Sequence, residues 1–471
     1  MLFNSLAFLL FFPIVCILYW LLPMKWRNMM LLVASYYFYM NWEPVYALLI
    51  AFTSITTWWI GNKIATGGGK NKKLYLTSGL VINFLILFVY KYLNFVTESV
   101  FAGLDMCGLR MEIPHFNLLL PVGISFYTFQ AVGYSIDVYR GTIKPEKSLW
   151  TYALFVSFFP QLVAGPIERA KNLLFQFHEK HVFDGEMFVD GLKLMVWGYF
   201  MKLGIAENVS SYVDAVYNNM AYHNGTSLWL ASFFFTFQIY CDFCGYSLIA
   251  IGAARCLGFR LMQNFNHPYL STSFRDFWRR WHISLSSWFA DYVYIPLGGS
   301  RCSEAKHQRN LFLTMVVSGV WHGANWTFIL WGVYHGLLQC IGSLKKKLNI
   351  CPLNDKNPLI HIVEVVVIFV FAMIGWVFFR ANNVSDVWLA FHKMFGEFGM
   401  LYNGEGKPAI ILPILLIGLL MAKEIKDEAG WRINFIHSKN EIISAVSTGM
   451  LLVLLLLCAS FKGGQFIYFQ F

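Results

Sequence analysis

Long runs of apolar residues alternate with short polar loops along the whole of this 471-residue chain. A hydrocarbon core of about 30 Å needs roughly 20 apolar residues in a helix to cross it. Several runs are too long, too short or too rich in glycine and proline to be simple spans, so we expect re-entrant or broken helices among them. The pattern predicts an all-α, polytopic membrane protein with about 11–13 membrane segments. The apolar runs fall near residues 5–22, 28–40, 44–61, 74–95, 117–136, 150–165, 190–205, 226–252, 311–341, 358–379, 408–422 and 441–460.

One uncharged run carries polar residues in its middle. Residues 310–344 contain no Asp, Glu, Lys or Arg, yet His322 lies near their centre between Gly319 and Gly323. Ionisable groups at membrane depth are costly and mark functional sites by default. A histidine takes up and returns a proton near neutral pH without a permanent charge, and the glycines allow close approach of a backbone or a substrate. The run indicates a catalytic histidine, although hydrogen bonding between packed helices would explain His322 equally well.

Composition narrows the class of protein. The chain is 57% hydrophobic and 13% charged, against about 25% charged in a soluble domain. The net charge of +10 comes from Lys and Arg in short loops between apolar runs, which is typical of cytoplasmic loops and gives no indication of nucleic-acid binding. The N-terminal run lacks a basic leader and a cleavage site, so we expect it to be kept as a membrane helix.

The basic loops predict an orientation. They alternate with loops that are poor in Lys and Arg or carry acids, which places the N-terminus outside and the basic loops in the cytoplasm. We see no internal repeat and expect a single membrane domain over residues 1–471. The basic loops contain Lys25 and Arg27, then Lys63, Lys70, Lys72 and Lys73, then Arg140, Lys144 and Lys147.

A second stretch, residues 274–299, interrupts the apolar pattern with charges and aromatic rings. Read as one helix, it places its tryptophans near one face and Arg275, Arg279 and His282 on another. An interfacial helix with Trp and Arg at the lipid headgroups would explain this composition. The alternative is a cationic wall for a phosphate-bearing donor, with His282 near the reaction centre.

Two further features stay open on composition alone. Cys241 and Cys244 form one C-x-x-C pair in an aromatic setting, without the second pair of a zinc site, so we expect no metal. Asp242 is interpreted as a buried structural acceptor or as the partner of an Arg or His. Asn325 and His335 are both compatible with packing between helices.

Several stretches of the chain form recognisable motifs. They are Phe158-Phe-Pro-Gln-Leu-Val-Ala-Gly-Pro166, Phe265-Asn-His-Pro-Tyr-Leu, Asp276-Phe-Trp-Arg-Arg-Trp-His282, Tyr294-Ile-Pro-Leu-Gly-Gly299, Ser318-Gly-Val-Trp-His322-Gly-Ala and Gly375-Trp-Val-Phe-Phe-Arg-Ala381. These stretches resemble the membrane-bound O-acyltransferase (MBOAT) family in its bacterial branch. Within that branch the chain is most similar to the membrane subunit of alginate O-acetyltransferase systems and more distantly similar to the D-alanyl transfer protein of teichoic acids. One stretch departs from the family pattern, because cysteines stand at 241 and 244 where relatives usually have other residues.

The resemblance implies an MBOAT-type helical bundle with a catalytic region at about residues 230–340. The family's membrane histidine matches His322, which we expect to act as general base, and its second histidine matches His282. Either His282 or Asn325 would orient the base or stabilise the developing oxyanion. No Ser or Cys stands in a nucleophile-elbow context, so direct transfer is expected. The predicted substrate-binding residues are Trp281, Arg279, Arg280, Asp242, Asn325 and Trp321.

The function implied is transfer of an acyl group, expected to be acetyl, to a hydroxyl of an exported polysaccharide or other envelope glycan. The donor would be acetyl-CoA or another phosphopantetheine thioester, with no permanently bound cofactor. A periplasmic or extracellular acetyltransferase partner would complete transfer, and the chain would lie among lipids as a multi-pass protein of the bacterial inner membrane. The alternatives are D-alanyl transfer from a carrier protein and a transporter of an acylated carrier, for which charged pairs at mid-membrane would be more typical.

Overall fold

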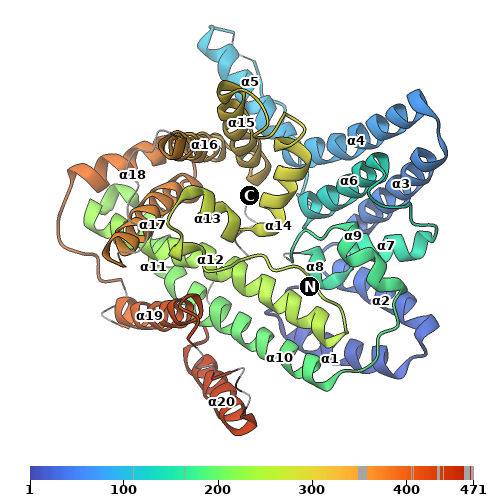
Figure 1. The fold of residues 1–471 in the computed structure, drawn as a ribbon. Helices are drawn as coiled ribbons and strands as arrows, with labels where there is room; N and C mark the ends of the chain where they lie inside the picture. The colour runs from blue at the N-terminus through green and yellow to red at the C-terminus, as the bar shows by residue number, and fades with distance from the viewer. Residues whose placement is uncertain are drawn as a thin grey trace. The chain divides into compact units, whose positions relative to one another are not determined.

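The computed structural model describes residues 1–109, 111–163, 165–347, 358–404, 406, 408–431, 435–436, 438, 440–460 and 467. Throughout these residues the regular secondary structure is helical, without a strand (Figure 1). The prediction of an all-α protein is confirmed.

Six helices of the described part are long and apolar enough to cross a membrane. Helix α1 (Leu6–Leu21) is also apolar but shorter. The set confirms an architecture with several membrane crossings, while a total of about 11–13 segments stays a prediction. The six candidate spans are Pro44–Thr66, Gly69–Lys91, Gly225–Cys256, Trp326–Leu344, Pro358–Arg380 and Glu441–Cys458.

The chain forms two compact units, the first made of Met1–Leu192 and Ile249–Met262 and the second of Lys193–Leu248 and Gln263–Phe471. The predicted single domain over residues 1–471 stays a prediction. Unit 1 contains α1 (Leu6–Leu21), α2 (Met24–Met40), α3 (Ala47–Thr66), α4 (Gly69–Lys91), α5 (Leu93–Met106), α6 (Ile124–Arg140), α7 (Leu149–Ser157), α8 (Phe159–Leu162) and α9 (Ala170–Leu173).

The candidate site lies in unit 2, which also takes in parts of two helices that begin or end in unit 1, α10 (Gly185–Tyr199) and α12 (Gly225–Cys256). A π-helical segment, Phe200–Ala206, joins α10 to α11, and a second one, Ala290–Tyr294, follows α14. The other helices of this unit are α11 (Glu207–Tyr217), α13 (Phe274–Arg280), α14 (Ile283–Phe289), α15 (Glu304–His322), α16 (Trp326–Lys347), α17 (Pro358–Arg380), α18 (Val384–Gly396), α19 (Pro408–Glu428) and α20 (Glu441–Cys458).

Most apolar runs correspond to single helices whose ends differ from the run by several residues, while the runs at 150–165 and 311–341 each divide between two helices. The run at 226–252 is α12, and the run at 358–379 is α17. The pattern missed α11, which is amphipathic rather than uniformly apolar. Its buried residues Val209, Val213 and Val216 follow the helical spacing of one face, so the signal was periodic and a search for long apolar runs does not register it.

The uncharged run 310–344 is a helical hairpin and not a single span. It is shared between the end of α15 and most of α16, which pack side by side (Figure 1). The expectation of a broken helix holds here, and the break falls directly after His322.

Residues 274–299 differ from the single helix that we read in the sequence. Helix α13 ends at Arg280, and α14 begins at Ile283. His282 lies at the break with φ 43° and ψ 55°, in the left-handed region that is unfavourable for a residue with a Cβ. The break turns His282 into the interior of unit 2, where it is buried.

Candidate active site

Helix α15 ends at His322, and a short turn reverses the chain into α16. Gly323 allows close packing at the turn, since a Cβ there would overlap the ring of Phe328. One turn earlier, a Cβ on Gly319 would lie 2.4 Å from the carbonyl oxygen of Phe328 and 3.0 Å from Cα of Gly332. The glycines beside His322 therefore allow close approach, and it is α16 that approaches.

The His322 side chain is buried among aromatic rings. Its ring meets Trp331 edge to face at a centroid distance of 4.9 Å, Phe379 at 5.4 Å and Trp321 at 5.1 Å. Such T-shaped contacts are favourable for aromatic pairs and fix the plane of each ring. The imidazole is thus held in one orientation by residues of α15, α16 and α17.

His282 is held by a buried polar group. Asn264 Oδ1 accepts hydrogen bonds from the backbone N–H of Ser284 (3.2 Å) and from its hydroxyl (2.9 Å), and lies 3.1 Å from His282 Nδ1. Because this oxygen can only accept, Nδ1 carries the proton. Burial lowers the pKa of His282 to about 3, so the ring is neutral near pH 7. Its Nε2 is then an acceptor and cannot donate to an oxyanion in this state.

The two histidines share a cavity of about 180 Å³, called here the inner cavity. They are 40 positions apart in the sequence, and both side chains line this space together with Trp278, Ser318 and Met315. The structure therefore brings together the two residues that the sequence predicted as catalytic. A catalytic role for either stays a prediction.

A larger cavity of about 770 Å³, the vestibule, adjoins the inner cavity, since both are lined by Arg275, Arg279, Tyr294, Leu311 and Gln339. The two arginines lie one turn apart on α13, and in the described part of the chain neither has a carboxylate within ion-pair distance. Guanidinium groups without an acidic partner are suited to bind phosphate. Arg275, Arg279 and His282 all line the inner cavity, although the break after Arg280 means that they do not share the face of one helix as predicted. The cationic wall for a phosphate-bearing donor stays a prediction.

Arg280 is placed differently from its neighbours. Its guanidinium lies 2.9 Å from Asp276 and 2.9 Å from Glu428, so its charge is already neutralised within the described structure. The pairing links α13 to α19. Arg280 does not line the inner cavity or the vestibule, and a binding role for it stays a prediction without support from this geometry.

The two predicted tryptophans pack in the core. Trp281 is 1% exposed and packs on Trp376 at 4.7 Å and on Phe277 at 5.7 Å. Trp321 lies between the two histidines, with ring centroids 6.1 Å from His282 and 5.1 Å from His322. Neither ring is among the residues that line the inner cavity, so their contribution in this structure is to position neighbouring side chains.

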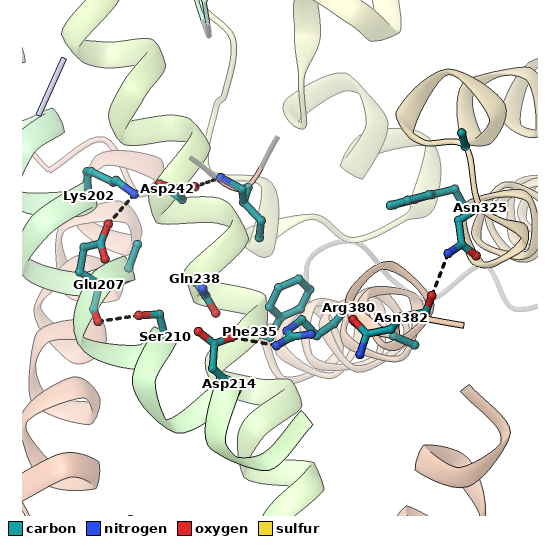
Figure 2. Close-up of a pocket in the computed structure, with 15 residues that line it drawn as sticks. Lys202, Glu207, Ser210, Asp214, Phe235, Gln238, Asp242, Asn325, Arg380 and Asn382 are labelled. Atoms are coloured by element: carbon teal, nitrogen blue, oxygen red, sulfur yellow. Dashed lines mark hydrogen bonds and ion pairs between the residues drawn. The ribbon is translucent and has the colours of Figure 1, made fainter. Parts of the chain in front are cut away.

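A third cavity, of about 330 Å³, is lined by ion pairs and is called here the ion-paired pocket (Figure 2). Lys202 Nζ lies 2.6 Å from Glu207 and 2.5 Å from Asp242, and Arg380 lies 2.8 Å from Asp214. Two carboxylates therefore face the one ammonium group of Lys202 in the interior of the described structure.

Asp242 and Asn325 both line this pocket. Asp242 accepts from the backbone N–H of Ile467 at 2.8 Å as well as pairing with Lys202. Asn325 Oδ1 accepts from Thr327 N at 3.0 Å and so caps α16, and its Nδ2 donates to the Asn382 carbonyl at 2.8 Å (Figure 2). Asn325 does not line the inner cavity, so this geometry gives no support for its predicted oxyanion role.

Sequence reasoning did not single out Lys202, Glu207, Asp214 or Arg380. Lys202 was visible as a charge inside the predicted run at 190–205, and intramembrane charge is a signal of function. Its location on the π-helical segment Phe200–Ala206 is a second signal, because π-helical turns are frequent at functional sites. Which carboxylates it meets depends on the packing of α11 and α12 against that segment.

The C-x-x-C pair is unremarkable in the structure. Cys241 and Cys244 are free and buried in α12, where a thiol behaves as a small hydrophobic group.

The family profile of the membrane-bound O-acyltransferases (MBOAT) matches residues 146–380. The chain is 41% identical over 401 residues to the probable alginate O-acetylase AlgI of Pseudomonas aeruginosa, covering 84% of this chain and 75% of the relative. It is 32% identical over 433 residues to the peptidoglycan O-acetyltransferase of Helicobacter pylori (85% and 81% covered). It is 27% identical over 358 residues to the teichoic acid D-alanyltransferase of Bacillus subtilis (71% and 85% covered).

The chain therefore belongs to the membrane-bound O-acyltransferase family. It is a multi-pass membrane protein and an O-acyltransferase, as the sequence motifs predicted. The resemblance to alginate O-acetylases and, more distantly, to teichoic acid D-alanyltransferases is confirmed. The matched region contains both histidines and most residues that line the three cavities.

Proposed function

We propose that this protein transfers an acetyl group from a cytoplasmic phosphopantetheine thioester to a hydroxyl that approaches from outside, with His322 as general base. The observation that carries the proposal is the shared inner cavity, which places His322 and His282 against a vestibule with two arginines. Acetyl is preferred to D-alanyl because the relatives named as O-acetylating proteins are 32% and 41% identical, against 27% for the D-alanyltransferase.

The donor enters through the vestibule in this proposal. Arg275 and Arg279 bind the phosphate groups, and the narrow inner cavity admits the pantetheine arm with its thioester. Acetyl-CoA and an acylated carrier protein share this chemistry, and no cofactor needs to stay bound between turnovers. Helix α15 is unbroken from Arg309 to His322, so His322 lies about 20 Å from that basic end at roughly 1.5 Å per residue.

The chemical step is direct acyl transfer. His322 removes the proton of the acceptor hydroxyl as its oxygen bonds to the acyl carbon, the carbon–sulfur bond breaks, and the thiolate receives the proton from His322. A positioned base contributes about 10²- to 10⁴-fold. His282 is a neutral acceptor at Nε2, so its proposed part is to orient a donor N–H, S–H or O–H group in the inner cavity.

We extend the proposal to the cellular setting from the names of the relatives. The final acceptor is an exported polysaccharide such as alginate, or another envelope glycan, and a periplasmic or extracellular acetyltransferase completes the transfer. The chain would lie in the bacterial inner membrane with its basic loops in the cytoplasm. The buried pairing of Lys202 with Glu207 and Asp242 is the kind of charged group that a transporter would have. Membership of the O-acyltransferase family favours acyl transfer over this alternative.

The test measures O-acetyl ester on envelope polysaccharide in cells with wild type, His322→Ala, or no copy of the gene. We expect His322→Ala to lower the ester at least about 100-fold, to the level of the deletion, with the protein still present in the membrane. His392→Ala is the matched control, since His392 is 61% exposed on α18 and its loss is expected to change nothing. An ester level equal to that of wild type in His322→Ala would show that His322 only packs between helices and is not the base.

A further inference from the structure

The ion-paired pocket has a charge balance that restricts what it can hold. Its ionisable lining consists of two cations, Lys202 and Arg380, and three carboxylates, Glu207, Asp214 and Asp242. Their net charge is −1 when all are ionised. Burial raises the pKa of Glu207, and its protonation would bring the sum only to zero. No positive charge is left over for an anionic ligand.

Both cations are also held geometrically. Lys202 lies between its two carboxylates. Arg380 donates to Asp214 at 2.8 Å and to Asn218 at 3.1 Å, and its guanidinium lies 5.3 Å from the centre of the Tyr217 ring. An anion that recruited either cation would have to break an existing pair, leaving a carboxylate without its counter-ion in a partly buried site.

The pocket still offers neutral hydrogen-bonding capacity. Gln238 lies in it between the Lys202 group and the Arg380 group (Figure 2). Its side-chain oxygen is buried and accepts no hydrogen bond within the described structure. A buried acceptor without a partner is unfavourable, and a ligand hydroxyl that donates to it would relieve this cost. At about 330 Å³ the pocket falls in the range of small-molecule sites.

Aromatic rings connect the pocket to His322. Phe328 lines the pocket and its ring meets that of Phe379 at 4.8 Å, and Phe379 in turn meets His322 at 5.4 Å. His322 lines the inner cavity on the other side of these rings. Phe328 and Phe379 thus form an aromatic partition between the base and the ion-paired pocket.

We infer that the ion-paired pocket is the acceptor site of the acyltransferase, that it takes an uncharged hydroxyl-bearing group rather than a uronate, and that the Phe328–Phe379 partition must part for transfer. The inference rests on the proposed function. A general base must come within about 3 Å of the hydroxyl oxygen, which the closed rings prevent. While closed, they also keep water on the pocket side away from the thioester.

The experiment uses the full-length protein in lipid nanodiscs with acetyl-CoA, following CoA release and ester formation. Methyl glucoside and methyl glucuronide serve as matched acceptor probes, because they differ by a hydroxymethyl group against a carboxylate. We expect ester on the glucoside and at least tenfold less on the glucuronide. Gln238→Leu is expected to raise the KM for the glucoside about tenfold and to leave the KM for acetyl-CoA within twofold.

Gln339→Leu is the matched variant on the donor side, since Gln339 lines the vestibule and the inner cavity. This variant should change the KM for acetyl-CoA and leave the KM for the glucoside unchanged. Phe328→Ala, with Phe328→Leu as the milder version, should raise CoA release without acceptor several-fold, because water then reaches the thioester. Folding of each variant is checked by size-exclusion elution and by its thermal unfolding temperature in the same detergent as wild type.

Each contrary result has a definite meaning. Three results would contradict the assignment of the acceptor site, provided that CoA release still depends on His322. They are equal or better use of the glucuronide, ester on neither probe, and an unchanged KM for the glucoside in Gln238→Leu. Unchanged CoA release without acceptor in both Phe328 variants would show that the two rings do not separate water from the thioester. Absence of any His322-dependent CoA release would instead count against the proposed function.

Discussion

At the scale of single residues, a lysine and two carboxylates meet in the interior of unit 2. Lys202, Glu207 and Asp242 are each at most 5% exposed. Removing one partner of a buried ion pair leaves an uncompensated charge, which costs more than the pair itself contributes. The three residues do not contribute equally, because Lys202 is the counter-ion of both carboxylates, whereas each carboxylate is one of two counter-ions of Lys202.

This asymmetry predicts an order of stability. Lys202→Met leaves two buried carboxylates facing each other and should lower the free energy of unfolding by about 3–5 kcal/mol. Asp242→Asn leaves the Lys202–Glu207 pair and an oxygen for Ile467 N–H, so it should cost clearly less. Lys193→Met, a half-buried lysine that donates to Ser444, is the control and should cost less than about 1 kcal/mol. Thermal unfolding in one detergent compares them, and equal losses for Lys202→Met and Asp242→Asn would refute the asymmetry.

The same residues show how far the sequence reaches at this scale. His322 could be predicted because a polar group in an uncharged run is conspicuous, and Arg275 and Arg279 because a spacing of four puts them on one helix face. The proximity of His282 to His322 could not be derived from spacing, since it depends on the left-handed turn at His282. The group of Lys202, Glu207 and Asp242 could not be predicted, because Asp242 lies 40 residues from Lys202 in sequence and only packing brings them together.

At the scale of elements, the α15–α16 hairpin positions the candidate base. The two helices approach so closely that Gly319 and Gly332 touch, with a Cβ on Gly332 placed 2.7 Å from the Met315 carbonyl oxygen. Small residues at such crossings allow backbone-to-backbone packing within membranes. The hairpin therefore fixes His322 relative to Phe328 and Trp331 on the neighbouring helix.

Two glycines of this hairpin form a matched pair for mutation. In Gly319→Ala the new Cβ meets backbone atoms that cannot rotate away, so we expect a loss of about 1–3 kcal/mol and a fall in ester formation. In Gly342→Ala, on α16, the Cβ meets nothing within 4 Å, so stability should be unchanged or raised by up to about 1 kcal/mol. Unfolding temperature and ester level are measured on both, and a tolerated Gly319→Ala would show that the helices separate more readily than the contact implies.

Hydropathy located the residues of the α15–α16 hairpin but did not show that they form two helices. A run of uncharged residues fits one long span or two packed helices, and only the glycines hinted at the turn after His322. Amphipathic helices such as α11 and α18 were missed for the opposite reason, since their charged residues interrupt the apolar run although one face is buried.

At the scale of the molecule, the unit that holds the site has two kinds of opening. The vestibule lies beside the start of α15, near Ser300 and His307, and the ion-paired pocket lies beside the far end of that helix, near Ala324 and Asn325. The order of helices agrees with the two openings lying on opposite faces of the membrane. Helices α15, α16 and α17 follow one another in sequence and each packs against the next, so the start of α15 and the end of α17 lie at opposite ends of the group. The alternation of basic loops predicted which face is cytoplasmic, but it could not reveal cavities, which arise from side chains of several helices.

The arrangement predicts that the two openings react from opposite sides of the membrane. Ser300→Cys lines the vestibule and Asn382→Cys lines the ion-paired pocket, both at exposed positions, in a background with the nine native cysteines replaced. A membrane-impermeant maleimide added to intact cells with an opened outer membrane should label Asn382→Cys, since that pocket would face outward. Ser300→Cys should be labelled only after the inner membrane is permeabilised, because the basic residues around it are held in the cytoplasm. Labelling of both from one side would mean that donor and acceptor openings share a face, and transfer across the membrane would then be excluded for this chain.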